Sequence, residues 1–323
     1  MNMNASTKSF HGINPLRATI NARKFFSINN LGVDNLVQVV LVTQKKRESF
    51  LPHTTLDGVV EFIKPIVGAG IPAIKLFTEG VSKRDDGKES VDENNLTNQA
   101  LRLIRNAFPK LYVMTENCLC PYTTHGSCAV HNRDGHIDAG ATADLFVKAA
   151  LLHAENGADA VGPAAMAEGL VEAVRNGLDT AGYNHIGVVP HLIINSYAYG
   201  PFRDLMQTGE GRMHRPSFQV NKNDRKAVMA VVEGFTQEGA TAIMFEPGLH
   251  INDLIYESSK ITNVPLGAFS TSAEYRLIVD NTRSDFPGGD PVLEHCQGIM
   301  RSGARFIVTY AAQELATLLS GSR

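Results

Sequence analysis

From residue 37 onward, the chain alternates between short apolar runs and longer stretches with the 3.6-residue periodicity of helices. Helical periodicity is clearest in 95–107, 141–156 and 224–237. The apolar runs are rich in β-branched residues and lack polar alternation, so both of their faces are expected to be covered, as in a parallel sheet. The pattern predicts eight strands, over 37–42, 73–77, 111–114, 158–162, 187–194, 240–245, 264–269 and 306–310.

Glycine precedes four of these strands, in Ala69-Gly70-Ile71, Asn156-Gly157-Ala158, Glu238-Gly239-Ala240 and Ser302-Gly303-Ala304. This is the residue favoured where a helix ends and the backbone turns left-handed before a strand. Eight strand–helix units predict an α/β fold of the (β/α)8 TIM-barrel type. A doubly wound open sheet is the alternative, but no Gly-x-Gly-x-x-Gly motif opens any of the helical stretches.

The polar residues 1–30 lack this rhythm and have little apolar surface to bury, so they are predicted to be either disordered or an extended N-terminal arm laid on another subunit, with the barrel over 31–323. The composition, with 43% hydrophobic and 20% charged residues, is typical of a soluble globular protein. A net charge of −3 gives no reason to expect nucleic acid or a membrane surface as partner. No run is long and apolar enough to span a bilayer, and the N-terminus shows no secretory signal. Together with the clustering of three of the four cysteines, this predicts a cytoplasmic protein.

The clustered cysteines, Cys118, Cys120 and Cys128, directly follow the third predicted strand. Cys118 and Cys120 are one residue apart in an extended segment, so their side chains should point the same way. The loop 121–126 then returns Cys128 toward them. Three converging thiolates suit a soft tetrahedral ion, with Zn²⁺ as the first candidate.

No fourth protein ligand is obvious, and three ligands plus an open position is the pattern of a zinc ion that handles water or substrate. Two alternatives stay open. The thiols could be buried structural groups, or His125 or His131 could complete a closed zinc site.

In a (β/α)8 barrel, the chemistry lies at the carboxyl ends of the strands. The sixth predicted strand ends at Glu246, so this carboxylate enters an apolar barrel mouth, where it can act as a general acid or base. A structural ion pair with one of the nearby arginines is the alternative for Glu246. The other residues at strand ends include Glu116, Ala164, Ser272 and Tyr310.

The string from Cys118 to Cys128 resembles the zinc-type porphobilinogen synthases (5-aminolevulinate dehydratases). That family carries a cysteine-Leu-cysteine-Pro-Tyr-Thr run, a His-Gly pair and then a third cysteine, as this chain does. The resemblance can be followed from about Leu16 to Leu319. It implies zinc held by the three cysteines, a small carboxylate-bearing substrate, and a homo-oligomer (dimer up to octamer) in which the arm packs on a neighbouring subunit.

The chain departs from this family at both Schiff-base lysines. The family's Met-Val-Lys-Pro motif holds the lysine that forms an imine with substrate, and here the motif ends in Glu246-Pro247. The second family lysine aligns with Ile193, and residues 192–204 contain no lysine. Neither glutamate nor isoleucine supplies the nucleophilic amine that an imine needs.

The residues that grip carboxylates in the family are retained. Arg203, Arg215 and Gln219 align with the contacts to one substrate carboxylate, and Ser272 and Tyr310 with the contacts to the other. The planar guanidinium fork of arginine matches a carboxylate. Taken without the resemblance, the arginines could be solvated or paired loop residues, Ser272 a turn residue and Tyr310 a core residue.

The sequence therefore predicts a zinc-dependent, porphobilinogen synthase-like lyase or condensing enzyme in a specialised biosynthetic pathway, acting on small carboxylated keto or amino substrates without a lysine Schiff base. The catalytic candidates are Glu246, Glu116 and His125. One alternative is a non-catalytic paralogue that binds metal or ligand and acts with partner subunits. The other is the retained condensation of two 5-aminolevulinates to porphobilinogen, which requires a lysine from elsewhere in the chain.

Overall fold

The structure is a computed structural model that describes residues 14–26, 31–208, 218–281 and 290–321. Within them, ten parallel strands form one sheet in the order β6-β5-β4-β3-β1-β10-β9-β8-β7, with β2 paired to β1. The strands are β1 (Leu36–Thr43), β2 (Thr54–Thr55), β3 (Ala73–Thr78), β4 (Tyr112–Asn117), β5 (Ala160–Pro163), β6 (Gly187–Val188), β7 (His191–Ile193), β8 (Ile243–Glu246), β9 (Leu266–Phe269) and β10 (Phe306–Thr309).

The strand order closes on itself through β6 and β7, which are two pieces of the single strand predicted over 187–194. Before Pro190 this segment pairs with β5, since the Val189 amide donates to the Val161 carbonyl at 2.8 Å. After the break it pairs with β8, and the Met244 amide donates to the Pro190 carbonyl at 3.0 Å. The predicted (β/α)8 barrel is thereby confirmed, with one strand split where the chain changes its pairing partner.

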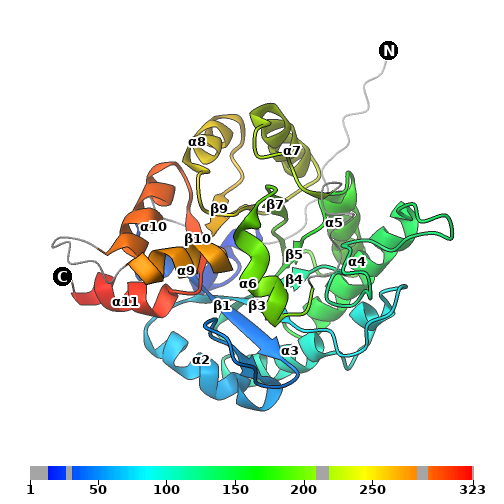
Figure 1. Cartoon of the computed structure of the whole chain (residues 1–323), viewed down its shortest axis with the longest axis horizontal. Helices are drawn as coiled ribbons and strands as arrows, with labels where there is room; N and C mark the ends of the chain where they lie inside the picture. The colour runs from blue at the N-terminus through cyan, green and yellow to red at the C-terminus, as the bar shows by residue number, and fades with distance from the viewer. Residues whose placement is uncertain (1–13, 27–30, 209–217, 282–289, 322–323) are drawn as a thin grey trace.

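Helices surround the sheet, as seen down the barrel in Figure 1. Several start at an Asn or Asp N-cap whose side chain accepts a hydrogen bond from a backbone amide of the first turn, as Asp138 does from Ala141. The outer helices are α2 (Val59–Gly68), α3 (Leu96–Ala107), α4 (Ala139–Glu155), α5 (Leu170–Thr180), α7 (Arg225–Gln237), α8 (Asn252–Ile261), α10 (Pro291–Arg301) and α11 (Ala312–Gly321).

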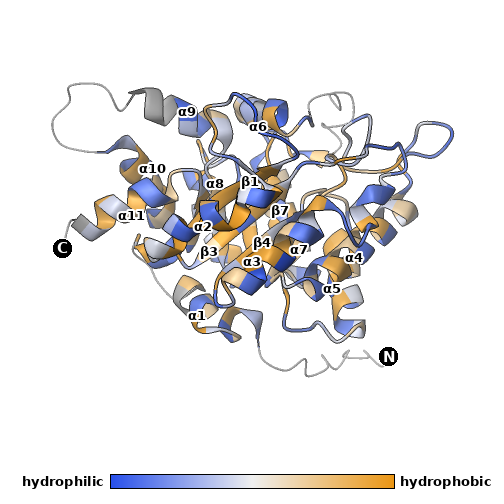
Figure 2. Cartoon of the chain, turned by 90° about the horizontal axis from the view of Figure 1, so that it is seen from below, coloured by the Kyte–Doolittle hydropathy of each residue, from blue (hydrophilic) through white to orange (hydrophobic). Residues whose placement is uncertain are grey.

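Two further helices lie over one end of the barrel, α6 (Gly200–Leu205) and α9 (Ser272–Asn281), and the opposite end is covered by α1 (Ile20–Phe26) (Figures 1 and 2). Both α6 and α9 follow the carboxyl ends of strands, β7 and β9 respectively. They therefore stand at the end of the barrel where the sequence places the candidate site residues.

Helix α1 falls in the segment predicted to be an extended arm, so residues 20–26 are helical rather than extended. The Phe25 ring is fully buried and packs at 5.8 Å from the Tyr112 ring and 5.1 Å from the Phe306 ring, measured between centroids. Helix α1 thus closes the end of the barrel opposite α6 and α9. Burying one aromatic ring such as Phe25 stabilises the folded state by roughly 1.5–3 kcal/mol. Residues 1–13 and 27–30 lie outside the described residues, and packing on a neighbouring subunit stays a prediction.

The strands form the apolar centre of the molecule in Figure 2. All eight residues of β1 are buried, which agrees with strands covered on both faces. One set of strand side chains faces the helices, and the alternate set fills the barrel interior, including Val39, Phe77, Met114 and Val308. Over the described ranges, no helix is both long and apolar enough to cross a bilayer.

Candidate active site

A pocket opens at the barrel mouth, at the ends of the strands and beneath α6 and α9. It brings together most of the side chains singled out in the sequence, from strands far apart in the chain. It is lined by Phe77, Glu116, Cys118, Cys120, Gly126, Ser127, Cys128, Ala164, Ile193, Tyr199, Phe202, Arg203, Thr208, Phe218, Gln219, Glu246, Phe269, Thr271, Ser272 and Tyr310.

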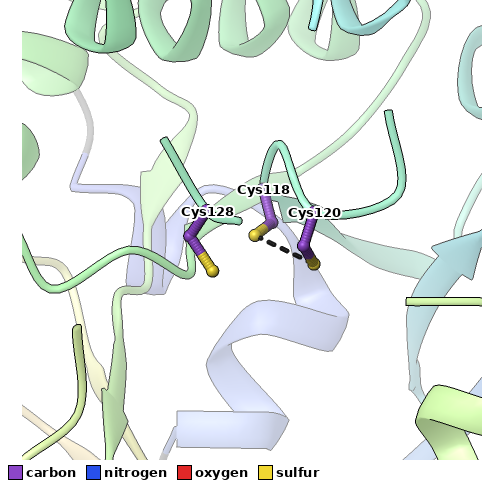
Figure 3. Close-up of side chains that lie close together, drawn as sticks. All are labelled: Cys118, Cys120 and Cys128. Carbon is purple, nitrogen blue, oxygen red and sulfur yellow. Dashed lines mark hydrogen bonds between the residues drawn. The ribbon is translucent and has the colours of Figure 1, made fainter. Parts of the chain in front are cut away.

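The three predicted metal ligands converge in one wall of this pocket. The Sγ atoms of Cys118, Cys120 and Cys128 all lie within 4.8 Å of one another, and the Sγ atoms of Cys118 and Cys120 are 3.3 Å apart. Figure 3 shows the three side chains pointing into a common space from the segment that follows β4. The loop that returns Cys128 is fixed by the Thr123 hydroxyl, which donates to the Ser127 carbonyl at 3.0 Å.

These separations suit a single metal ion. With Zn–S bonds of about 2.3 Å in a tetrahedron, sulfur atoms stand about 3.8 Å apart. Sulfur atoms that all lie within 4.8 Å of one another, two of them 3.3 Å apart, can reach this arrangement with small side-chain shifts. Hydrogen bonds with Cys120 and Cys128, and then burial, raise the pKa of the Cys118 thiol well above its usual range. A divalent cation would relieve that crowding, because it favours the thiolate form of each ligand.

Glu246 ends β8 with its side chain almost fully buried and lies in the pocket wall. Its backbone is held in place by two neighbours. The Ile194 amide donates to the Glu246 carbonyl at 2.8 Å, and the Tyr199 hydroxyl lies 2.9 Å from the same oxygen. Among the described residues, the ionisable side chain that pairs with the Glu246 carboxylate is His191, rather than an arginine.

The turn after Glu246 is tied to the neighbouring strand by a fully buried carboxylate. Glu274, in the first turn of α9, accepts hydrogen bonds from the Gly248 amide at 3.0 Å, the Thr271 amide at 3.0 Å and the Thr271 hydroxyl at 2.6 Å. A carboxylate with three donors locks the two loops together. These three hydrogen bonds of Glu274 fix the loops at the barrel mouth next to the Glu246 side chain.

Glu116, near the end of β4, is the second carboxyl group in the pocket. Burial, and next the nearby Cys120 sulfur, raise the pKa of Glu116 well above its usual range, while Lys75 opposes them. The predicted catalytic pair, Glu116 and Glu246, therefore does line one pocket together with the three cysteines.

Two ionisable residues in the barrel escaped the sequence interpretation, Lys75 on β3 and His191 on β7. Both are fully buried and lie below the pocket rather than in its wall. The available signal was a single lysine at an alternate position between Ala73 and Phe77, in a run otherwise free of charge. An apolar run covered on both faces does not reveal which alternate positions point into a barrel.

The predicted carboxylate-binding residues have different placements. Arg203 lines the pocket, and its guanidinium carbon lies 4.8 Å from the centroid of the Tyr199 ring, a stacking contact that orients the fork. Gln219 also lines the pocket and accepts a hydrogen bond from the Asn195 side chain at 2.9 Å. Arg215 lies outside the described residues, so its predicted role remains a prediction.

Ser272 and Tyr310 both line the pocket but differ in their hydrogen bonding. The Ser272 hydroxyl accepts from the Phe202 amide at 3.0 Å and lies 3.3 Å from the Ala198 carbonyl, so it already joins α9 to α6. The Tyr310 hydroxyl is buried and has no hydrogen-bond partner among the described residues. Burial, then Glu246 and Glu116, raise the pKa of Tyr310 well above its usual range, so its hydroxyl is a donor.

His125 does not line the pocket, although it was predicted as a catalytic residue. Its Nδ1 accepts from the Ser127 amide at 3.1 Å, and its ring packs edge-on against His131 with centroids 4.8 Å apart. Neither imidazole joins the three cysteine sulfurs within 4.8 Å in the described structure. The arrangement favours support of the cysteine loop over a closed four-ligand site, and a catalytic role for His125 stays untested.

Comparison with known proteins points to one family. A family model described as delta-aminolevulinic acid dehydratase matches residues 13–318. The delta-aminolevulinic acid dehydratase of Archaeoglobus fulgidus is 31% identical, covering 93% of this chain and 95% of the relative, and that of Halalkalibacterium halodurans is 30% identical, covering 94% and 95%. The crystal structure of the Toxoplasma gondii enzyme in complex with porphobilinogen superposes with a TM-score of 0.86 at 24% identity, covering 94% of this chain and 89% of that one.

Proposed function

The chain belongs to the delta-aminolevulinic acid dehydratase (porphobilinogen synthase) family, and from this premise we propose that it is a zinc-dependent lyase or condensing enzyme that works without a lysine Schiff base. Its substrate is a small carboxylated keto or amino acid. The observation that carries the proposal is that Glu246 lines the same pocket as Cys118, Cys120 and Cys128. The barrel mouth thus offers a carboxylate and a soft-metal site side by side.

The proposal that no imine forms is based on the residues that line the pocket. Glu246 and Ile193 occupy the positions that carry lysines in the resembling synthases, and both line the pocket. Among the described residues, no lysine lines it, and the undescribed segments 209–217 and 282–289 contain no lysine in the sequence. Without a nucleophilic amine the substrate carbonyl must be activated in another way.

When bound to the three thiolates, zinc supplies a Lewis acid that polarises a carbonyl oxygen. Glu246 would take a proton from the carbon next to a substrate carbonyl, and Glu116 is a second carboxyl group in the same pocket for proton transfer. Arg203 and the Tyr310 hydroxyl face the pocket as donors for a substrate carboxylate. Phe202 and Arg203 of α6 and Ser272 of α9 line the pocket, and both helices lie over this end of the barrel, where they would limit the entry of water (Figures 1 and 2).

The test uses the purified, zinc-loaded full chain and a panel of acids that includes 5-aminolevulinate and related keto and amino acids. We expect turnover of at least one acid, loss of that turnover after zinc removal and recovery after zinc is restored. Borohydride added during turnover should leave the protein mass unchanged. A stable adduct on a lysine would favour the parent condensation, and thermal stabilisation by these acids without turnover would favour a non-catalytic binding protein.

Two further features belong to the proposal. We infer a cytoplasmic homo-oligomer, on the family resemblance and on the N-terminal segment beyond the barrel. Light scattering of the full chain tests the oligomer, with a value well above the 35.0 kDa of one chain expected. A monomer at micromolar concentration would contradict this part and leave the chemistry of the pocket untouched.

A further inference from the structure

Directly beneath the pocket, the barrel interior contains a charged side chain. Lys75 projects from β3 between the inward-facing Ala73 and Phe77 and has no exposed surface. Its Nζ donates to the Thr115 carbonyl at 2.9 Å. An ammonium group has three donors, and a fully buried one is retained only where an opposite charge or further acceptors support it.

His191 on β7 is a second fully buried ionisable residue of the barrel interior, and it faces the Glu246 carboxylate. The Nδ1 atom of His191 lies 3.4 Å from the Oε1 atom of Glu246. Its Nε2 atom is buried and has no hydrogen-bond partner among the described residues. Burial, and next the proximity of Lys75, lower the pKa of His191 to about 4, so the imidazole is neutral near pH 7.

Gly162 on β5 leaves the space that these two groups use. A Cβ atom at this position would stand 2.3 Å from the Lys75 Nζ and 2.8 Å from the His191 Nε2. The amine and the imidazole therefore border one small space in the barrel, and a residue with any side chain at 162 would displace one or both. This space lies in the layer of barrel side chains directly below Glu246.

The pKa of Lys75 depends on burial and on two nearby carboxyl groups. Burial lowers the pKa of Lys75 to about 8, while Glu116 and then Glu246 oppose that change by favouring the ammonium. Tyr310 and Tyr199 lie near this region with hydroxyls that stay protonated. On the helix side of β4, burial and next Lys75 lower the pKa of His153 to about 3, so this ring is neutral too. At neutral pH the layer therefore contains one cation, one neutral imidazole and two carboxyl groups at the pocket floor.

We propose that Lys75 and His191 are positioning residues for Glu246, with Lys75 as its buried counter-cation and His191 as the hydrogen-bond donor that aims its carboxylate into the pocket. The proposal rests on the proposed function, since it explains how Glu246 can serve as a base in a nearly dry site. Neither residue lines the pocket, so the proposed role of both is exerted through Glu246 rather than on the substrate. Lys75 is likewise too deep to replace the lysines missing from the pocket wall.

The test is a double-mutant cycle that needs no substrate. The zinc-loaded chain, Lys75→Met, Glu246→Gln and the combined variant are melted at pH 7. Each single change leaves a buried charge without its partner, so each should lower the midpoint by about 5 °C or more. The combined variant should lose clearly less than the sum of the two. Additive shifts would overturn the proposal.

A second cycle separates the two carboxyl groups. Lys75→Met is combined with Glu116→Gln, and we expect coupling with both acids because both favour the ammonium form of Lys75 against burial. Coupling confined to Glu116 would also overturn the proposal for Glu246. Should Lys75→Met fail to fold, Gly162→Ala replaces it in both cycles, since it displaces the ammonium without removing it. Gly234→Ala in α7 is the matched control, because a Cβ there meets nothing within 4 Å.

The role of His191 needs a kinetic readout. His191→Phe should lower kcat by tenfold or more with KM changed less than threefold, and His191→Asn, which keeps an N–H donor, should recover part of that loss. Equal kinetics for the two variants would contradict the positioning role. If no acid in the panel is turned over but Lys75 and Glu246 remain coupled in stability, the proposed function fails while the buried arrangement stands.

Discussion

The Nδ1 atom of His191 lies 3.4 Å from the Oε1 atom of Glu246. Burial lowers the pKa of this imidazole to about 4, so near pH 7 the contact joins a neutral ring to the carboxyl group rather than two full charges. The described ionisable side chain that contacts the Glu246 carboxylate therefore comes from the barrel interior. It is His191, and not Arg203 in the pocket wall. An ion pair of Glu246 with Arg215, which the sequence left open, stays a prediction, because Arg215 lies outside the described residues.

The first prediction concerns the metal. Cys128→Ala should lower the zinc content of the purified protein from about one per chain to less than 0.2, because two thiolates bind a soft ion far more weakly than three. Cys118→Ala should do the same. Elemental analysis after dialysis measures this directly.

Cys296 provides the matched control for the zinc measurement. It is a fully buried cysteine in α10, away from the pocket lining, so Cys296→Ala removes a thiol without touching the cluster. This variant should keep the full zinc content. Zinc lost equally from the Cys296 and Cys128 variants would place the metal elsewhere.

The second prediction concerns the Tyr310 hydroxyl, which is buried in the pocket without a partner. Tyr310→Phe should leave the thermal midpoint nearly unchanged, since no hydrogen bond within the described protein is lost. It should weaken binding of a carboxylate such as 5-aminolevulinate about tenfold or more, as a hydrogen bond to a charged group is worth about 1.5–3 kcal/mol. Calorimetric titration measures the affinity, with Tyr256→Phe on the exposed face of α8 as control.

If instead Tyr310→Phe lowers the midpoint strongly and leaves the affinity intact, the tyrosine is a core residue. A core role is the alternative that the sequence alone leaves open for Tyr310. The same titration on Arg203→Ala should show a comparable or larger loss of affinity, because the guanidinium faces the same pocket.

The third prediction concerns Glu274, whose carboxylate accepts three hydrogen bonds from Gly248 and Thr271. Glu274→Ala should lower the free energy of unfolding by about 3–5 kcal/mol, because each buried donor left unpaired costs about 1–3 kcal/mol. Urea denaturation measures it. Glu257→Ala, which removes an exposed ion pair with Arg225, should change stability by less than about 1 kcal/mol. Equal losses of stability in the two variants would mean that the three hydrogen bonds of Glu274 do not stabilise the fold.

The fourth prediction is a pH dependence. Burial lowers the pKa of Lys75 from 10.5 to about 8. Between these values the unfolded chain binds a proton that the folded chain has lost, so the free energy of unfolding should rise with pH in that window. The slope from this one group is at most about 1.4 kcal/mol per pH unit. The penalty is fully present below pH 8 and gone above 10.5.

The Lys75→Met variant isolates this contribution, because every other titrating group is kept. The difference in unfolding free energy between wild type and variant, followed by urea denaturation from pH 7 to 10.5, should change in favour of the wild type as the pH rises. A difference that stays constant with pH would show that Lys75 keeps an ordinary pKa in the folded protein.

Much of the fold could be predicted from the sequence, because parallel strands covered on both faces leave continuous apolar runs. The strand predicted over 73–77 is observed as Ala73–Thr78. The strand predicted over 187–194 was expected to be continuous, yet the chain changes its pairing partner at Pro190. A proline lacks the amide donor of a regular ladder, but an apolar run does not show that the two halves pair with different neighbours.

Only the part of the candidate site at the carboxyl ends of the strands could be predicted from the sequence. Glu116, Glu246 and the cysteines follow strand ends, where topology alone brings them together. Lys75 and His191 lie one layer deeper, inside strands whose average character is apolar. Finding them requires knowing which alternate positions face the barrel axis, and that depends on the registers of strands distant in sequence.

The most direct measurement of the central claim is the rate at which zinc-loaded Glu246→Gln consumes the best substrate of the wild-type enzyme, with zinc content measured on the same sample. The account predicts a rate lowered by at least about 100-fold at unchanged zinc content, because a positioned base contributes 10²–10⁴-fold. A rate equal to that of the wild type, with zinc still bound, would contradict the claim that Glu246 carries the proton transfer.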